Sequence, residues 1–378
     1  MRTTRRRGNN EGTVYQRPNG RWVGMISLPE GKRKAFYGRT RDEVQGKMTE
    51  EKHARNLGTA AASRTMSVGA YLDQWLEGTA KPSVRPNTYH GYEVQVRVHI
   101  KPTLGRIPLD RLEPAHVQAL INAKLKEGLS PKTVHYMYST LRNALNQAVR
   151  WEYVTRNVAA VVGGPRMERY EIQPFTREEA HKFLAAVKGN RLEALYTVAL
   201  TMGLRQGEAL GLRWRDVDLD VGSIRVNKQL QRIDRKYQLT ELKTSRSRRT
   251  LVVPAAILGS LRQHKEGQDA ERRAAGEAWR DTDLVFARRW GYPLSSSVVT
   301  HRFQELLERI GLPRRRFHDL RHSCATLLLA QGVSPRVVME ILGHSQISLT
   351  MNTYTHVLPE LRQDAADRMS DLIRGEGR

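Results

Sequence analysis

The N-terminal part of the chain alternates apolar and polar side chains at the period of β-strands. Three such runs, bounded by Pro-Asn-Gly and Glu-Gly turn signals, predict strands at residues 12–16, 21–29 and 32–39. Residues 41–56 change to a helical period, with Thr40 as the expected N-cap. Residues 57–66 are small and polar, which predicts a linker. We therefore expect a three-stranded sheet with one helix, followed by a break.

The next hundred residues have apolar positions at helical spacing and no strand pattern. Each predicted helix after the first begins at or next to a proline, which is tolerated in the first turn. The expected helices are residues 68–77, 86–100, 114–128 and 130–154. Ser130 is the expected N-cap of the last one. This pattern predicts an all-α domain of four or five helices, followed by a second linker at residues 163–173.

The remaining half mixes helical and strand patterns. A capping box of Thr176 and Glu179 opens a helix, and the apolar residues 191–202 predict a buried helix that Gly203 ends. Strand-like runs around turns follow between residues 217 and 253. A last amphipathic helix is expected at residues 358–374. The fold class predicted for the whole chain is multidomain and mainly α, with small β-sheets (α+β).

Composition and charge restrict the possible partners. The net charge of +24 favours a polyanion such as nucleic acid, although a merely soluble basic protein is the alternative. Residues 1–64 contain 15 Lys and Arg against 6 Asp and Glu, and the arginines among the first seven residues predict a flexible basic arm for DNA or a solvated tail. No apolar run reaches the ~20 residues of a membrane span. One cysteine excludes internal disulfides and thiolate-rich zinc sites, so we expect a cytoplasmic protein.

The candidate chemistry gathers near the C-terminus. His318, Arg321 and His322 are spaced i, i+3 and i+4, so a helix places them on one face. His344 follows, and Tyr354 comes ten residues later. A guanidinium binds phosphate oxygens in a fork, and a phenol can act as an oxygen nucleophile. The set indicates a protein that handles phosphodiesters; His322 and Cys324 are interpreted as a helix-face neighbour and a core residue.

These motifs resemble those of tyrosine recombinases, the family of phage integrases. The family's upstream arginine corresponds to Arg205, followed by Glu208, in TMGLRQGEALGLRW, and its hairpin lysine corresponds to Lys243 in LKTSRSRR. All the family positions are filled in order. The resemblance is strong over residues 174–378 and covers the preceding region in outline. It implies three domains: a basic arm with an arm-type DNA-binding domain at 1–64, an all-α core-binding domain at 65–165, and a catalytic domain with a C-terminal helix at 174–378.

The resemblance also implies a mechanism. Tyr354 would attack the scissile phosphate to give a 3′-phosphotyrosyl link and a free 5′-hydroxyl. His318 would be the base or proton relay, and Lys243 the acid for the leaving oxygen. Arg205, Arg321 and His344 would hold the phosphate, and Glu208 would orient Arg205 and His318. We expect neither metal nor ATP nor any other cofactor, because the sequence has no magnesium-binding carboxylate cluster and no phosphate-binding glycine loop.

The expected partner is double-stranded attachment-site DNA, bound by a homo-tetramer in the bacterial cytoplasm. The resemblance implies that the apolar stripe of the helix at residues 358–374 docks onto a neighbouring protomer, and packing on its own domain is the alternative. A directionality factor and a DNA-bending host protein are possible further partners, and no membrane is expected. The candidate DNA-contacting residues are cations in the arm, near helix starts and beside Lys243: Arg2, Arg5, Arg6, Arg7, Arg21, Lys32, Lys34, Lys81, Arg85, Lys132, Arg246 and Arg248. Tyr37 is a further contact candidate, whereas Trp22 is interpreted as core.

Three alternatives share parts of this pattern. A DNA-binding regulator that has lost the chemistry would lack one of the motif residues. A type IB topoisomerase uses the same chemistry but lacks an arm-binding domain. A transposase of an integrative conjugative element has the same motifs and stays open.

Overall fold

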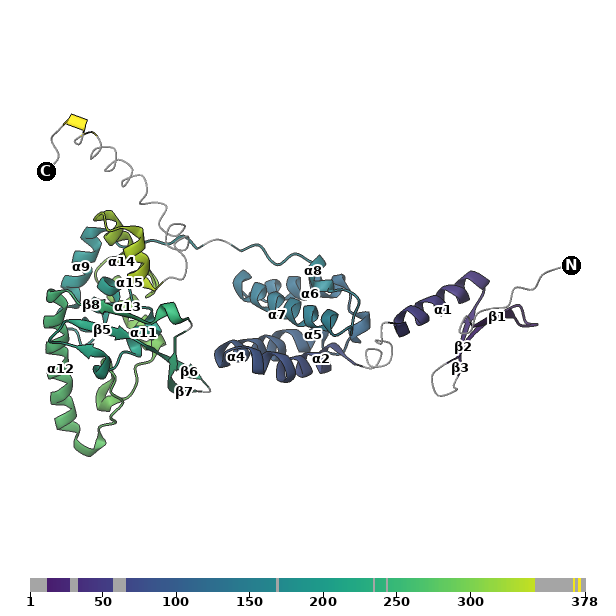
Figure 1. Ribbon diagram of the computed structural model, residues 1–378, viewed down its shortest axis with the longest axis horizontal. Coiled ribbons are helices and arrows are strands. Elements are labelled where there is room, and N and C mark those ends of the chain that lie inside the picture. Colours follow the sequence, from purple (N-terminus) through teal and green to yellow (C-terminus); the bar gives the residue numbers. More distant parts are fainter. Residues whose placement is uncertain are drawn as a thin grey trace. The chain divides into compact units, whose positions relative to one another are not determined.

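The computed structural model describes residues 12–27, 33–56, 66–167, 170–233, 235–242 and 244–343, together with Ser370, Ile373 and Arg374. The chain forms two compact units, residues 1–169 and 170–378 (Figure 1). The predicted fold class, mainly helical with small antiparallel sheets, is confirmed.

The first unit begins with the predicted three-stranded antiparallel sheet and helix. The strands are β1 (Thr13–Gln16), β2 (Trp22–Ser27) and β3 (Arg33–Gly38), in the order β1-β2-β3, and α1 spans Arg41–Asn56. Thr40 Oγ1 accepts the N–H of Glu43 at 3.2 Å, as expected for the N-cap. The helix packs so closely on the sheet that a Cβ at Gly24 would lie 2.3 Å from Met48 Sδ. A side chain at this position would therefore force Met48 and Val44 of α1 to move.

The second part of this unit is all helical. Its elements are α2 (Val68–Trp75), α3 (Lys81–Ser83), α4 (Pro86–Val94), α5 (Lys101–Leu104), α6 (Pro114–Lys126), α7 (Pro131–Arg150) and α8 (Val158–Val161). π-helical turns η2 (Leu76–Ala80) and η3 (Gln95–Ile100) extend α2 and α4, and η4 (Leu109–Arg111) is a 3₁₀ turn. Ser130 Oγ accepts the N–H of Thr133, as predicted, but α7 ends at Arg150 rather than residue 154. The buried Tyr71 hydroxyl donates to the carbonyl of Ala144 at 2.5 Å and joins α2 to α7.

The second unit combines helices with two small antiparallel sheets. Its helices are α9 (Arg177–Val187), α10 (Glu193–Met202), α11 (Gln206–Leu210), α12 (Ala255–Ala275), α13 (Ser296–Arg309), α14 (Asp319–Ala330) and α15 (Pro335–Leu342). Its strands are β4 (Val217–Asp218), β5 (Ser223–Val226), β6 (Lys228–Ile233), β7 (Lys236–Glu241) and β8 (Arg249–Val252). Short 3₁₀ turns lie at η5 (Trp214–Asp216), η6 (Ser245–Ser247), η7 (Gly276–Ala278) and η8 (Arg289–Gly291).

Helix α10 forms the centre of this unit. Its residues Leu195, Val198 and Ala199 are fully buried, and the helix contacts both α12 and α14, as the apolar run predicted. Gly203 ends it in the left-handed region, with φ of 60°. A Cβ at Gly203 would lie 2.5 Å from Leu342 Cδ2, so both the backbone angle and the close approach of α15 require glycine.

The strands form two antiparallel sheets, one of order β4-β5-β8 and one hairpin of β6 and β7. β7 ends at Glu241 and β8 begins at Arg249. The connection between these strands contains Lys243, which itself lies outside the described residues. Among the helices that the structure describes, none is long and apolar enough to cross a membrane.

Candidate active site

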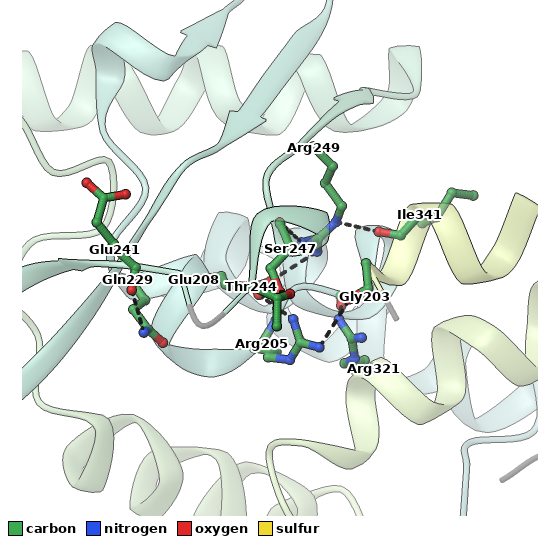
Figure 2. Close-up of polar contacts among 11 residues, drawn as sticks. Gly203, Arg205, Glu208, Gln229, Glu241, Thr244, Ser247, Arg249, Arg321 and Ile341 are labelled. Atoms are coloured by element: carbon green, nitrogen blue, oxygen red, sulfur yellow. Dashed lines mark hydrogen bonds and ion pairs between the residues drawn. The ribbon is translucent and has the colours of Figure 1, made fainter. Parts of the chain in front are cut away.

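Two of the predicted arginines meet at the turn that follows α10. Arg205 is the N-cap residue of α11, two residues after Gly203. Arg321 lies in the first turn of α14 and is only 1% exposed. Its Nη1 donates to the carbonyl oxygen of Gly203 at 2.7 Å, although the two residues are 118 positions apart in sequence. Figure 2 shows both guanidiniums beside this turn.

Glu208 holds Arg205 in place. Its carboxylate is buried and accepts the backbone N–H of Arg205 at 3.1 Å and Arg205 Nη1 at 2.6 Å. Burial by itself raises the pKa of Glu208, but the guanidiniums of Arg249 and Arg205 outweigh it and lower the pKa below its ordinary value. Glu208 is therefore ionised and fixes Arg205, whose side chain stays 36% exposed and open to a ligand.

Arg249 is the other partner of Glu208, and the sequence interpretation did not assign it a role. Its Nη2 donates to Glu208 Oε2 at 3.0 Å, and the side chain is 7% exposed. The signal that could have found it is the alternation along β8. Leu251 and Val253 are buried while Thr250 and Val252 are exposed, so the period of two places Arg249 on the buried face.

His318 and His322 lie side by side at the start of α14, as their spacing predicted. Their ring centroids are 5.0 Å apart and the rings are nearly perpendicular. Burial, followed by the charges of Arg321 and Arg205, lowers the pKa of His318 to about 4. Burial and then His318 lower the pKa of His322 to about 4. Both imidazoles are therefore neutral near pH 7, and a neutral His318 can accept a proton.

The buried Asp319 fixes the start of α14. Its carboxylate accepts the Tyr170 hydroxyl at 2.8 Å and pairs with Arg316 at 2.9 Å, while Arg316 also stacks over the Tyr170 ring at 3.5 Å. Burial raises the pKa of Asp319, but its hydrogen bonds with Arg316 and Tyr170 outweigh burial and lower it. Five residues after Tyr170, the N–H of Phe175 donates to Ser323 Oγ at 2.7 Å. These hydrogen bonds hold residues 170–175 against α14, the helix that carries Arg321.

Six of the candidate DNA-contacting residues are exposed in the described part of the chain. Lys81, Arg85 and Lys132 are exposed, at the start of α3, at the N-cap of α4 and in the first turn of α7. Lys81 pairs with Glu77 at 2.6 Å. Arg246 and Arg248 are exposed just before β8, and Arg21 is exposed just before β2. The predicted residues that lie outside the described segments are Arg2, Arg5, Arg6, Arg7, Lys32, Lys243, His344 and Tyr354.

The N-terminal sheet separates Lys34 from Tyr37. Lys34 pairs across the sheet with Ile26, on the face that α1 covers, and its ammonium pairs with the buried Glu51 at 2.8 Å. Tyr37 is 51% exposed on the opposite face, where the Arg17 guanidinium lies 5.5 Å from its ring. Trp22 packs against the small core beneath α1, as interpreted. The open face therefore presents Tyr37 rather than Lys34.

The described part of the chain contains no group of three or more His, Cys, Asp or Glu side chains that could hold a metal ion. The arrangement of cations around Arg205 instead suits an anionic ligand. Arg205 is partly exposed, Arg321 lies at the same turn, and His318 lies one turn of helix from Arg321. Such a site can bind a phosphate and accept a proton beside it.

Comparison with known proteins identifies the class. The profile described as "Phage integrase family" matches residues 173–360, and "Phage integrase, N-terminal SAM-like domain" matches residues 67–125. A protein named "Tyrosine recombinase XerC-like" from Caldanaerobacter subterraneus is 33% identical, over 90% of this chain and 92% of its own length. An "Integrase" from Streptomyces ambofaciens is 30% identical, over 99% of each chain.

Solved structures share the fold. The Tn1549 transposon integrase in complex with transposon right end DNA has a TM-score of 0.67 at 22% identity, over 81% of this chain and 100% of that one. A lambda integrase dimer bound to a COC′ core site has a TM-score of 0.57 at 19% identity, over 93% and 96%. The chain belongs to the phage integrase family. It is a tyrosine-type site-specific DNA recombinase, as the motifs predicted.

Proposed function

We propose that this recombinase cleaves DNA with Tyr354 as nucleophile, while Arg205 and Arg321 bind the non-bridging oxygens of the scissile phosphate. The Tyr354 oxygen forms the new bond to phosphorus, and the bond from phosphorus to the 5′-oxygen breaks. A 3′-phosphotyrosyl link and a free 5′-hydroxyl result. Attack by the 5′-hydroxyl of another strand reverses the step and rejoins the DNA, so no cofactor is consumed.

The protons move through His318 and Lys243. The Tyr354 phenol has an ordinary pKa of about 10 and must lose its proton as it attacks. His318 accepts that proton directly or through a relay, since it is neutral before DNA binds. An anionic phosphate between the arginines opposes their effect on the imidazole and raises its pKa, which makes it a better base. Lys243 donates a proton to the leaving 5′-oxygen, and His344 adds a hydrogen bond to the phosphate.

The observation that carries this proposal is the meeting of Arg205 and Arg321 at the Gly203 turn, next to His318. Chemistry on a phosphodiester needs cations where charge develops on the non-bridging oxygens, and each such donor is worth roughly 10²–10³ in rate. Glu208 holds Arg205 by two hydrogen bonds, so the guanidinium is oriented before DNA arrives. The Arg205 side chain therefore loses its conformational entropy when the protein folds, and not during the reaction.

We assign the DNA-binding roles by domain. Residues 1–64 form the arm-type domain, 65–165 the core-binding domain, and 174–378 the catalytic domain. In the first, the face of the sheet that presents Tyr37 and Arg17 is the one free to enter a groove, because α1 covers the other. In the second, Arg85 and Lys132 lie at helix starts that bind phosphates readily.

We further propose that the active assembly is a homo-tetramer on two attachment-site duplexes in the bacterial cytoplasm. The solved relatives include a lambda integrase tetramer bound to a Holliday junction, which supports this assembly. Of the predicted C-terminal helix, the structure describes only Ser370, Ile373 and Arg374, and its docking onto a neighbouring protomer stays a prediction. A directionality factor and a DNA-bending host protein would complete the assembly.

The test is a nicked suicide duplex that carries the element's junction, on which cleavage releases a short strand and traps the covalent link. The wild-type protein should form an SDS-resistant adduct, and Tyr354→Phe should form none. DNA affinity should stay unchanged in Tyr354→Phe, because Lys and Arg contacts to phosphates dominate it. An SDS-resistant adduct with Tyr354→Phe would show that another residue is the nucleophile.

A further inference from the structure

The Arg249 guanidinium lies at the junction of three chain segments. Its Nη2 donates to Glu208 Oε2 at 3.0 Å, its Nε to the carbonyl of Ile341 at 2.6 Å, and its Nη1 to the carbonyl of Ser247 at 3.0 Å. Figure 2 shows these bonds in one cluster. Because each of its three guanidinium nitrogens donates to a protein acceptor, Arg249 is poorly placed to bind DNA.

Each acceptor belongs to a segment that leads to a proposed catalytic residue. Glu208 holds Arg205. Ser247 closes the turn that follows Lys243, where its hydroxyl also lies 2.9 Å from Thr244 Oγ1. Ile341 is in the last turn of α15, three residues before His344. Arg249 therefore joins the segments on which Arg205, Lys243 and His344 are carried.

The end of α15 is shaped around this guanidinium. Gly343 adopts the left-handed conformation with φ of 65°, and a Cβ there would lie 3.1 Å from Arg249 Nη1. Arg205 Nη2 also reaches the Gly343 carbonyl, at 3.4 Å. Both arginines thus donate to the last carbonyls of α15. A planar guanidinium can serve three acceptors in fixed directions, whereas a lysine ammonium at this depth could not reach all of them.

The charges favour the same arrangement. Burial lowers the pKa of Arg249, while Glu208 opposes that effect, and the guanidinium stays protonated. The charge of Arg249 lowers the pKa of Glu208 more than the charge of Arg205 does. Arg249 therefore keeps Glu208 ionised and leaves the other carboxylate oxygen for Arg205.

We propose that Arg249 is a positioning residue for strand cleavage. It fixes Glu208, and through it the Arg205 guanidinium, against the segments that lead to Lys243 and His344. The inference rests on the proposed role of Arg205 at the phosphate. Loss of Arg249 should therefore slow the chemical step without weakening DNA binding.

A double-mutant cycle tests this inference with the full chain. Single-turnover cleavage of the nicked suicide duplex is measured at saturating DNA for wild type, Arg249→Met, Arg205→Ala and the double variant. Arg249→Met should cleave about 10–100 times more slowly, the usual effect of losing a residue that holds a functional side chain in place. The double variant should be no slower than Arg205→Ala, because Arg249 acts through Arg205. Purely structural damage would instead multiply the two defects.

Arg272→Met is the matched control. Arg272 is 55% exposed and pairs with Asp281 at the surface of the same unit, so its loss should leave the rate unchanged. Arg249→Lys keeps the charge beside Glu208 and replaces Arg249→Met in the experiment if that variant does not fold. The Lys variant should have a melting temperature near that of wild type and still cleave more slowly. Wild-type cleavage by the folded variant, or multiplied defects, would overturn the inference. Wild-type cleavage by Arg205→Ala would instead refute the proposed phosphate contact.

Discussion

Replacing Glu208 by Gln measures how strongly the buried carboxylate holds the site together. Glu208 is 2% exposed, and its two partners, Arg205 and Arg249, have side chains 36% and 7% exposed. Gln keeps the shape but removes the charge, so Arg249 is left buried without its counter-ion. Removing one partner of a buried ion pair costs about 3–5 kcal/mol. Arg205 is partly exposed, so solvent screens its interaction with Glu208. We therefore expect a loss of stability at the lower end of this range, about 3 kcal/mol.

This decrease in the free energy of unfolding lowers the melting temperature, Tm. For a unit the size of residues 170–378, each kcal/mol shifts Tm by about 2–4 °C, so Glu208→Gln should lower it by roughly 6–12 °C. Circular dichroism of the full chain on heating gives the value. Asp281→Asn is the control. Asp281 is 60% exposed and pairs with Arg272 at the surface, and such pairs contribute less than about 1 kcal/mol.

The pH dependence gives a second test of the same prediction. The folded pKa of Glu208 lies below its ordinary value of 4.5. A carboxylate with a depressed folded pKa stabilises above its unfolded pKa and loses that contribution as pH falls through the folded one. The gap between wild type and Glu208→Gln should thus be constant from about pH 5 to 8 and shrink below about pH 4. A Gln variant that melts like Asp281→Asn, or a gap that survives at low pH, would refute the reasoning.

Three further predictions concern other parts of the chain. Because the pKa values of His318 and His322 are lowered from 6.5 to about 4, the unfolded chain takes up protons first as pH falls from 6.5 to 4. The Tm of DNA-free protein should therefore fall over this window, and less steeply in His318→Gln or His322→Gln; equal slopes would contradict the burial. Lys243→Ala should slow cleavage by about 10²–10⁴, the usual contribution of a general acid. A substrate with sulfur at the 5′-bridging position should restore it, and no restoration would assign Lys243 to binding. Deleting residues 1–64 should abolish binding to a distal arm site and leave core-site cleavage intact; unchanged footprints on attachment-site DNA would disprove the arm-type domain.

Local signals allowed much of the fold to be predicted from sequence. Thr176 and Glu179 form the expected capping box, and Gly203 ends α10 as expected. Each of these features depends on neighbours within one helical turn, so the sequence contains all the necessary information. The structure also brings the motif residues Arg205, Arg321 and His318 close together, while their catalytic roles stay predictions.

The features that could not be predicted from the sequence depend on contacts between residues far apart along the chain. The alternation along β8 indicates that Arg249, its first residue, lies on the buried face, but only the structure shows its acceptors in α11 and α15. Lys34 carries a charge suited to DNA, but the strand register places it beside Glu51. The anchoring of Tyr170 to Asp319 joins residues 149 positions apart. Such pairings follow from the tertiary fold rather than from any local pattern.

The central claim, that Arg205 and Arg321 neutralise charge on the scissile phosphate, is tested most directly with a charge-free phosphate. A suicide duplex with a methylphosphonate at the cleavage position replaces one non-bridging oxygen by a methyl group. On ordinary DNA, Arg205→Ala and Arg321→Ala should each cleave roughly 10²–10³ times more slowly than wild type. On the methylphosphonate the account predicts that at least one of these defects shrinks strongly, because less charge remains to be neutralised. Equal defects on both substrates, for both variants, would contradict it.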